Sequence, residues 1–418
     1  MRFSTRLLML PALIGCPGLA VLEAQVKPAS ATAEIAPVSA RWNRLVPKFA
    51  DEAAASRKAA RQAAAGDSAA LRRIAMAQPP LPFRTYTLLS VAQYAAVNSA
   101  RDKRDVSSDA AVASASAAVI AEMYPDSTVR ASIFRELARD LDKVRAASRG
   151  QARATAGGSL GEDIAHRVIA WAPTFNLVAP WKGTIPTGPG MWYSARGIPP
   201  IGVTLTTART WVLDSAAQFR PAPPPSFDSP VFKAALEEVR RVARERTPEQ
   251  TKVAQKWNDS DPWTMWNQTA VDAIRRNHMS DAQAARVLAV LNVAAMDAVV
   301  ACFEAKYHYW TIRPSQADTT LVLADSVGLP NFPSFPSGHA CSAGAFDAAL
   351  GNFFPGERTQ ITRIAEEQAM SRLYGGIHYR YDNDGGLELG RVIARYVVAR
   401  EKQGALNGWR SAPVARKP

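Results

Sequence analysis

The chain has 418 residues, of which 47% are hydrophobic and 21% are charged, and its formal net charge is +13. This composition excludes a mostly disordered chain, and three cysteines exclude a disulfide-built scaffold or a cysteine-rich zinc module. The positive charge is compatible with a polyanion partner, a small anionic substrate or merely a basic surface, so it leaves the partner open.

The first residues have the features of an export signal. Two arginines precede a short apolar run from Leu7 to Leu22, and Ala24 offers a small residue for cleavage. Because the run is short for a bilayer span, we predict a signal peptide over residues 1–24 and an exported protein, periplasmic or secreted. The residues that end at Cys16 also resemble a lipoprotein cleavage box, but apolar residues continue beyond it, so lipid anchoring is the less favoured interpretation.

Helical patterns dominate the first half of the chain. Apolar periodicity, interrupted by prolines and glycines, predicts helices over residues 41–71, 86–100, 109–123, 127–147 and 161–171. Asp126 stands in the N-cap position of the fourth of these helices. We therefore expect residues 25–172 to form an N-terminal helical half, which contains no catalytic motif.

Residues 173–229 differ in character from the segments on either side. They contain many prolines, which often mark linkers, but also large aromatic residues such as Trp181, Trp192 and Trp211. Since tryptophan side chains are usually well covered by protein, we predict a packed, irregular connector.

Helical patterns return at Pro230. We predict a C-terminal helical bundle over residues 230–402 and a basic tail over residues 403–418. Thr247 and Ser280 each begin a capping box. Convincing alternating strands are absent from the sequence, so the fold class that we predict is all-α, with a helical bundle architecture.

Two further features bear on the architecture. Leu89–Ala100 can be aligned with Leu291–Cys302, which hints at two similar bundles, of which only the second carries the chemistry described below. The most apolar later stretch, Val287–Phe303, contains Asn292 and Asp297, so it predicts a buried helix and no membrane span.

Three polar segments lie close together in the C-terminal half. They are Lys306-x6-Arg313-Pro314, Pro336-Ser337-Gly338-His339 and Ser371-Arg372-x5-His378-x3-Asp382. Each segment alone also fits an ordinary structural role, such as surface charge, a helix start or a histidine–aspartate hydrogen bond. Their occurrence together, in this order, favours a site for an anion.

The second segment is expected to begin a helix. Ser337 can cap it, and Gly338 lets an anion approach free backbone N–H groups closely. The third segment is expected to break a helix at Gly375 and Gly376 and to restart it at His378.

A helix that restarts there would place His378 and Asp382 on one face. Asp382 can then accept from one ring nitrogen and leave the other nitrogen with its lone pair free. Lys306, Arg313 and Arg372 supply charge-assisted donors, and both arginines are shaped to fork a tetrahedral oxyanion.

Together the three motifs resemble the signature of the type 2 phosphatidic acid phosphatase and vanadium-dependent haloperoxidase superfamily. The proline-rich connector and the missing membrane helices resemble its soluble haloperoxidase-type branch. The resemblance implies a vanadate or phosphate site made by Lys306, Arg313, Arg372, the Ser337 hydroxyl and the Gly338 amide. It also implies that His339 is the acid–base, that Asp382 orients His378, and that His378 is the axial group that attacks phosphorus or coordinates vanadium.

Two reactions follow from this resemblance. A haloperoxidase would hold vanadate at His378 and oxidise halide with hydrogen peroxide, whereas an acid phosphatase would hydrolyse a phosphate ester through phospho-His378 without a cofactor. A protein that only binds oxyanions is a third interpretation. It is disfavoured because pure binding needs the cations but neither an acid such as His339 nor a tethered nucleophile.

Two phenylalanines bear on the choice between these reactions. Phe332 lies where haloperoxidases that resemble the fungal chloroperoxidases place a phenylalanine beside the metal. Phe303 falls where those enzymes tend to have tryptophan, which puts a halide pocket in doubt. An ordinary core role fits both residues equally well.

The remaining expectations are brief. Cys302 and Cys341 flank site residues, and the sequence leaves open whether they form a disulfide. His308 is expected to be structural. No basic stripe interleaved with stacking aromatics indicates nucleic-acid binding, so we expect small-molecule substrates, and the oligomeric state, including a homo-oligomer, is left open.

Overall fold

The computed structural model describes residues 36–411 except 71–79, 148, 174–176, 178, 180 and 195–197. The predicted signal peptide over residues 1–24, with Cys16, lies outside the described residues, as does the end of the basic tail. The described part of the chain forms one compact unit. The division into an N-terminal half, a connector and a C-terminal bundle stays a prediction.

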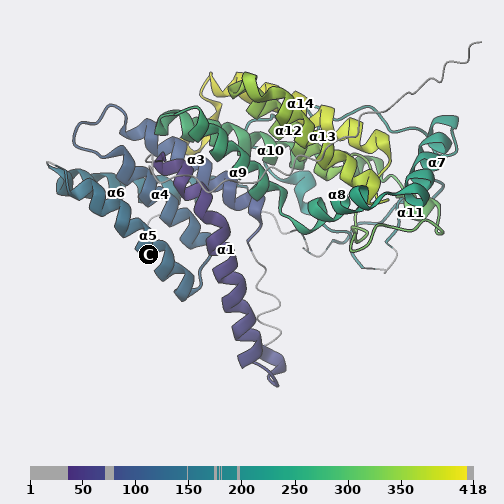
Figure 1. The fold of residues 1–418 in the computed structure, drawn as a ribbon, viewed down its shortest axis with the longest axis horizontal. Coiled ribbons are helices and arrows are strands. Elements are labelled where there is room, and N and C mark those ends of the chain that lie inside the picture. Colours follow the sequence, from purple (N-terminus) through teal and green to yellow (C-terminus); the bar gives the residue numbers. More distant parts are fainter. Residues whose placement is uncertain are drawn as a thin grey trace, which may run out of the picture. The chain divides into compact units, whose positions relative to one another are not determined.

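The first half of the described chain is helical, as predicted (Figure 1). Its helices are α1 (Val38–Ala63), α3 (Pro82–Ala100), α4 (Ser108–Met123), α5 (Ser127–Arg145) and α6 (Gly150–Trp171). Asp126 caps α5 through the N–H groups of Thr128 and Val129, which confirms its predicted role. α1 ends earlier than predicted because the chain turns at Gly66, whose φ is +94°.

Helix α6 begins at Gly150, well before the predicted start at residue 161. The glycines of this segment argue against a helix by propensity alone. In the structure they allow close packing, because a Cβ on Gly161 would lie 2.2 Å from the carbonyl oxygen of Ala111 on α4. Tertiary contact therefore outweighs the poor intrinsic propensity of the segment.

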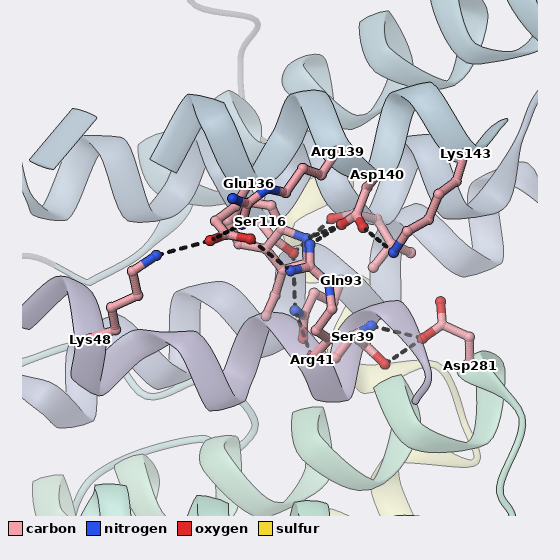
Figure 2. A network of polar contacts seen from close by, with 12 residues as sticks. Ser39, Arg41, Lys48, Gln93, Ser116, Glu136, Arg139, Asp140, Lys143 and Asp281 are labelled. Atoms are coloured by element: carbon pink, nitrogen blue, oxygen red, sulfur yellow. Dashed lines mark hydrogen bonds and ion pairs between the residues drawn. The ribbon is translucent and has the colours of Figure 1, made fainter. Parts of the chain in front are cut away.

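Helix α1 is attached to two other helices by polar contacts (Figure 2). Arg41 forms ion pairs with Glu136 and Asp140 on α5, and Lys48 lies 2.9 Å from Glu136. At the start of α1, the Ser39 backbone and side chain both donate to Asp281, at 2.8 Å and 2.6 Å. These contacts fix the orientation of α1 against α5 and the start of α10.

The connector is irregular and packed, as predicted. Its described residues contain one short 3₁₀ helix, η1 (Val203–Thr207), and an isolated bridge between Met191 and Thr311. Asp297, fully buried on α10, accepts hydrogen bonds from three successive backbone N–H groups, those of residues 211–213. The connector is therefore anchored directly to the central helix.

The second half is again helical, and no strand is present among the described residues. Its elements are α7 (Pro230–Glu245), α8 (Pro248–Asp259), α9 (Pro262–Arg276), α10 (Asp281–Tyr309), α11 (Pro314–Ala317), α12 (Gly338–Phe353), η2 (Pro355–Glu357), α13 (Arg358–Tyr374), α14 (Arg380–Glu401) and η3 (Ala405–Ser411). The all-α fold class is confirmed, as are the capping boxes at Thr247 and Ser280.

Helix α10 is the centre of the core, and it packs on α3 from the first half and on α12 and α14 from the second. Its polar Asn292 is buried and donates to Ser90 on α3 at 2.9 Å. By length and composition α10 is the one described helix that would suffice for a membrane span, but 89% of its most apolar stretch is buried inside the protein. This is the pattern of a core helix, as the sequence predicts.

Candidate active site

Three buried cations lie at element ends in the C-terminal half. Lys306 is in the last turn of α10, Arg313 precedes α11, and Arg372 is in the last turn of α13. Their side chains are 0%, 0% and 2% exposed, respectively. All three act electrostatically on His378, which shows that they converge on one place.

Backbone carbonyls hold these cations in position. Lys306 Nζ donates to the carbonyls of Pro333 and Ser334, at 3.0 Å and 2.7 Å. The Arg313 guanidinium donates to Phe332 at 3.1 Å and to Ile377 at 2.8 Å. Arg372 donates to Ala254 on α8 at 3.0 Å. Since neutral carbonyls do not cancel the charges, the site stays strongly positive.

His378 and Asp382 form the predicted pair, with 2.8 Å between Nδ1 and Oδ2. The prediction that a helix restarts at His378 is wrong, because α14 begins at Arg380 with Tyr379 as its N-cap. A turn at Gly376, whose φ is +79°, and an extended Tyr379 place the histidine before the helix. The pair therefore spans a helix start and does not lie along one helical face.

The hydrogen bonds of His378 define its tautomer. The Asp382 carboxylate accepts from Nδ1, so Nδ1 carries the proton and Nε2 keeps a lone pair. Arg313 Nη1 lies 3.1 Å from Nε2 and donates to that lone pair. Asp382 also accepts from the Ser334 hydroxyl at 2.5 Å and from the Tyr379 backbone N–H at 3.1 Å.

Burial shifts the titration of each group. Burial, reinforced by the charge of Arg313, holds the pKa of His378 well below its usual value, so the ring is neutral at pH 7. Burial raises the pKa of Asp382 to about 6 and lowers the pKa of Lys306 to about 8. At neutral pH the site thus combines a neutral imidazole, an ionised carboxylate and charged cations.

The start of α12 provides a further anion-binding feature. Ser337 is the N-cap residue, but its hydroxyl makes no capping bond and, although buried, has no hydrogen-bond partner among the described residues. A Cβ on Gly338 would meet no atom within 4 Å, so the space over the helix start is open. The free first-turn N–H groups and the unpaired hydroxyl suit an oxyanion.

His339, the second residue of α12, faces the last turn of α8. Its Nε2 lies 3.1 Å from the Trp257 carbonyl, which can only accept, so Nε2 carries the proton and Nδ1 is unprotonated. Loss of hydration on partial burial, together with the charge of Arg372, lowers the pKa of His339. At neutral pH the ring is therefore uncharged, and Nδ1 is the nitrogen with a free lone pair.

Comparisons with known proteins agree with this geometry. Residues 286–403, which carry all of these site residues, match the family model of the PAP2 superfamily.

The resemblance to this superfamily that the motifs predict is thus confirmed over this segment of the chain.

Two solved structures share the fold of this protein over most of the chain. A bacterial vanadium-dependent iodoperoxidase has a TM-score of 0.66 at 23% identity, covering 78% of this chain and 92% of its own. An apo-type bacterial vanadium-dependent chloroperoxidase has a TM-score of 0.60 at 12% identity, covering 79% and 96%. At these identities the likeness shows the fold.

Two curated relatives are similar over a short segment. They are lipid A 1-phosphatases of Rhizobium etli and Rhizobium johnstonii, each 42% identical over 72 residues, or 16% of this chain. The match spans less than a third of their own length, 31% and 30% respectively.

Phe332 and Phe303 form an apolar wall of the candidate site. Their ring centroids are 5.3 Å apart, and the Phe332 ring lies 5.2 Å from Lys306 Nζ and 5.1 Å from Arg313 Cζ. Gly202 of the connector, with a φ of +80°, packs so closely on Phe303 that a Cβ there would lie 2.4 Å from the ring. The structure thus brings both phenylalanines together beside the cations, and their use as a halide pocket stays a prediction.

Some site residues escaped the sequence analysis. Ser334 bonds both Asp382 and Lys306, yet only its position between two prolines, just before the Pro336 motif, could have drawn attention to it. The carbonyls of Ala254 and Trp257 carry no sequence signal at all. His308 is exposed and packs edge-on against Tyr309, away from the site, as expected for a structural residue.

The described residues are not arranged to bind a metal cation. Among them, no group of three or more His, Cys, Asp or Glu side chains is placed to ligate one. The site instead offers three cations, an unpaired hydroxyl and one imidazole lone pair, which is the donor set that a tetrahedral oxyanion requires.

Proposed function

We propose that the protein is a vanadate-dependent haloperoxidase, which oxidises a halide with hydrogen peroxide. The observation that carries this proposal is the apolar wall of Phe332 and Phe303 directly against Lys306 and Arg313. A phosphate ester needs no such wall beside its oxygens, whereas a weakly hydrated halide is favoured next to a cation and an apolar surface. The shared fold with vanadium-dependent peroxidases over most of the chain supports the same choice.

The residues present fit vanadate. The unpaired Ser337 hydroxyl, the open space at Gly338 and the three cations match its oxygens, and His378 Nε2 offers the nitrogen ligand once Arg313 releases it. Bound vanadate would activate peroxide for transfer of an oxygen atom to the halide. Fixed charges around it would stabilise the negative charge that builds on its oxygens.

The protein's own groups handle orientation and protons. Asp382 holds the proton on His378 Nδ1 and so keeps Nε2 directed at the anion. His339 Nδ1 accepts a proton from incoming peroxide, because its Nε2–H is held by the Trp257 carbonyl. The buried position of the cations keeps bulk water away from the reacting atoms.

The test is halide oxidation by the purified protein with hydrogen peroxide, with and without orthovanadate. We expect vanadate-dependent halogenation of an organic acceptor, with iodide and bromide tested beside chloride. His378→Ala should abolish it, while vanadate-free protein serves as the control. Absence of vanadate-dependent turnover with all three halides would contradict the proposal.

A second candidate is an acid phosphatase, which the lipid A 1-phosphatase relatives favour. His378 Nε2 would attack phosphorus, and water would then release phosphate from phospho-His378. Its leaving group needs a proton from His339, whose lowered pKa confines this step to acidic pH. We expect any metal-independent ester hydrolysis to rise below neutral pH and to be inhibited by vanadate. Saturable oxyanion binding with neither activity would support a binding protein instead.

We also propose that the protein is exported, on the strength of the arginine-led apolar run in residues 1–24. N-terminal sequencing of protein recovered from the producing cells tests this. A mature chain that begins near residue 25 is expected, and an intact Met1 or a lipid on Cys16 would contradict cleavage at Ala24.

A further inference from the structure

Two cysteines lie together beneath the anion site and take no part in the proposed reaction. Cys302 is on α10 and Cys341 is on α12, both are free thiols, and both are 0% exposed. Helices α10 and α12 pack against each other, and Cys302 Sγ lies 3.7 Å from the carbonyl oxygen of Pro336, next to the start of α12. The two thiols are close enough for each to shift the pKa of the other. The pair therefore joins the two helices that flank the site.

Each cysteine lies within one helical turn of a site residue. Cys302 precedes Lys306 by four residues on α10, so both share one helical face. Cys341 follows His339 by two residues, and its backbone N–H donates to the Ser337 carbonyl at 2.9 Å. A change in the distance between the two sulfurs would therefore shift Lys306 on α10 and the anion-binding turn at Ser337 on α12 relative to each other.

The environment of the pair favours oxidation. Burial opposes ionisation of Cys302, but the hydrogen bond from Cys341 and the charge of Lys306 bring the pKa of its thiol below the usual value. The thiolate is the form that reacts with peroxides. Gly338 and His339, at the start of α12, are part-exposed, so a small oxidant that enters the anion site comes within a turn of Cys341.

We propose that Cys302 and Cys341 are an oxidative modification site, at which hydrogen peroxide forms a disulfide when no oxyanion is bound, and that this disulfide weakens oxyanion binding. The inference rests on the proposed function, because peroxide is the co-substrate there. The Cys302 sulfur attacks one peroxide oxygen and releases water, which leaves a sulfenic acid. The Cys341 thiol then displaces a second water, so two thiols and one peroxide give one disulfide and two waters.

The structural consequence follows from bond geometry. A disulfide holds its sulfurs at about 2.05 Å, whereas thiols in hydrogen-bond contact lie considerably further apart. Oxidation would draw α10 toward α12 at this point and move Lys306 relative to Ser337. Because three cations must meet one small tetrahedral ion, such a shift lowers affinity, whereas an ion already bound resists it.

The test uses the full chain with Cys16→Ser, so that only the two buried thiols remain. Protein reduced with dithiothreitol and desalted is treated with hydrogen peroxide, with and without saturating phosphate. We expect the mass to fall by about 2 Da, which corresponds to two lost hydrogens, and a linked Cys302–Cys341 peptide to appear. Dithiothreitol should reverse the change, and phosphate should slow it.

The second readout is the affinity of the protein for tungstate, an oxyanion, measured by titration calorimetry. The peroxide is removed from the treated protein before the titration. We expect oxidation to weaken tungstate binding by about tenfold, in keeping with a misplaced charge-assisted bond. Cys341→Ala is the matched control, which should bind tungstate as the reduced protein does, both before and after peroxide treatment.

Thiols that stay free after peroxide, or a disulfide that leaves affinity unchanged, would overturn the inference. Because neither readout uses halide, a protein without haloperoxidase turnover that still forms the disulfide and loses affinity would leave this inference standing.

Discussion

Ser334 connects two parts of the candidate active site. Its hydroxyl donates to Asp382 at 2.5 Å, and its carbonyl accepts from Lys306. The hydroxyl thereby stabilises the ionised carboxylate, which in turn fixes the tautomer of His378. Ser334 thus bears on both the charge and the orientation of the predicted site residues around it.

We predict that Ser334→Ala lowers kcat on the order of tenfold, as loss of an outer hydrogen bond typically does. Without the hydroxyl, the pKa of Asp382 rises further above about 6, so activity should fall off at a higher pH on the acid side. The pH profile of whichever activity the protein shows is the measurement. Ser334→Thr, which keeps the hydroxyl, should restore the profile, and an unshifted acid limb in Ser334→Ala would contradict the role.

Lys306 should limit anion binding on the alkaline side. Burial lowers its pKa to about 8 in the anion-free protein, so its charge is present below that pH and is lost as the pH rises through it. Tungstate, which keeps one charge state over this range, should bind progressively more weakly above pH 8 in titration calorimetry. Lys306→Arg should bind with little dependence on pH there, and a flat profile in the unmodified protein would exclude the explanation.

The motif residues of the site were predictable because their roles depend on the type of side chain, which the sequence gives directly. Lys306, Arg313, Arg372, His378 and Asp382 carry charge or a titrating ring at fixed spacings, and the structure brings them together. The groups that hold them were not predictable. Backbone carbonyls look alike in every residue, so nothing in the sequence distinguishes the two on α8 that face the site.

At the scale of elements, α8 positions the site without contributing a side chain to it. The carbonyls of Ala254 and Trp257, in its C-terminal half, accept from Arg372 and His339, while the Trp257 indole donates to Glu367 on α13 at 2.9 Å. Lys256 also pairs with Glu367, at 2.7 Å. Because Arg372 itself belongs to α13, the two helices hold the cation from both sides.

We predict that Trp257→Phe lowers kcat several-fold while costing about 1 kcal/mol of stability, the usual value for one lost hydrogen bond. The loosened turn should misplace His339, so the pH dependence of kcat should change as well. Lys256→Ala is the matched control, since it leaves the Trp257 hydrogen bond in place and removes an exposed ion pair with Glu367 and an exposed cation–π contact with the Trp257 ring, each of which contributes little. Equal kinetic effects in both variants would show that the α8 turn has no positioning role.

The contact between α4 and α6 offers a paired test of close packing. A Cβ on Gly161 would lie 2.2 Å from the Ala111 carbonyl, whereas a Cβ on Gly158, in the same helix, would meet only Ser114 Oγ at 3.5 Å. We predict that Gly161→Ala destabilises the protein by about 1–3 kcal/mol. Gly158→Ala should instead stabilise it by about 0.5–1 kcal/mol, because alanine is the better helix former. Thermal unfolding of the two variants is the measurement, and equal shifts would contradict the packing argument.

The contact between α4 and α6 also explains which helix boundaries could be predicted from the sequence and which could not. α3, α4 and α5 have clear apolar periodicity and caps, and their predicted ranges lie close to the observed ones. The start of α6 was missed because its glycines are favourable only against a neighbour that the sequence does not specify. Helix existence was thus predictable from local pattern, whereas helix extent depended on tertiary contact.

At the scale of the whole molecule, α10 makes the two halves interdependent. One hydrophobic core contains buried residues of α3 and α4 as well as of α10, α12 and α14. Leu288 and Leu291 of α10 are completely buried in it, and Asn292 bonds across to α3. A site built at the end of α10 therefore depends on helices that supply none of its side chains.

We predict that thermal unfolding follows a single cooperative transition, since no part of this core is complete without the other half. Tryptophan fluorescence and far-UV circular dichroism should report the same midpoint. A chain truncated to residues 230–418 should fail to fold or to bind tungstate. Two separate transitions, or a truncated chain with native affinity, would contradict the shared core.

The three cations of the site are held by neutral carbonyls, with Asp382 as the buried carboxylate among them. An empty site of this kind repels its own charges, so its occupancy and the stability of the fold are thermodynamically linked. An oxyanion at a hundred times its Kd would add about 2.7 kcal/mol to the free energy of unfolding. We therefore expect phosphate and sulfate buffers to act as ligands of this protein, so that measurements made in them describe a different state from measurements made in Tris or HEPES.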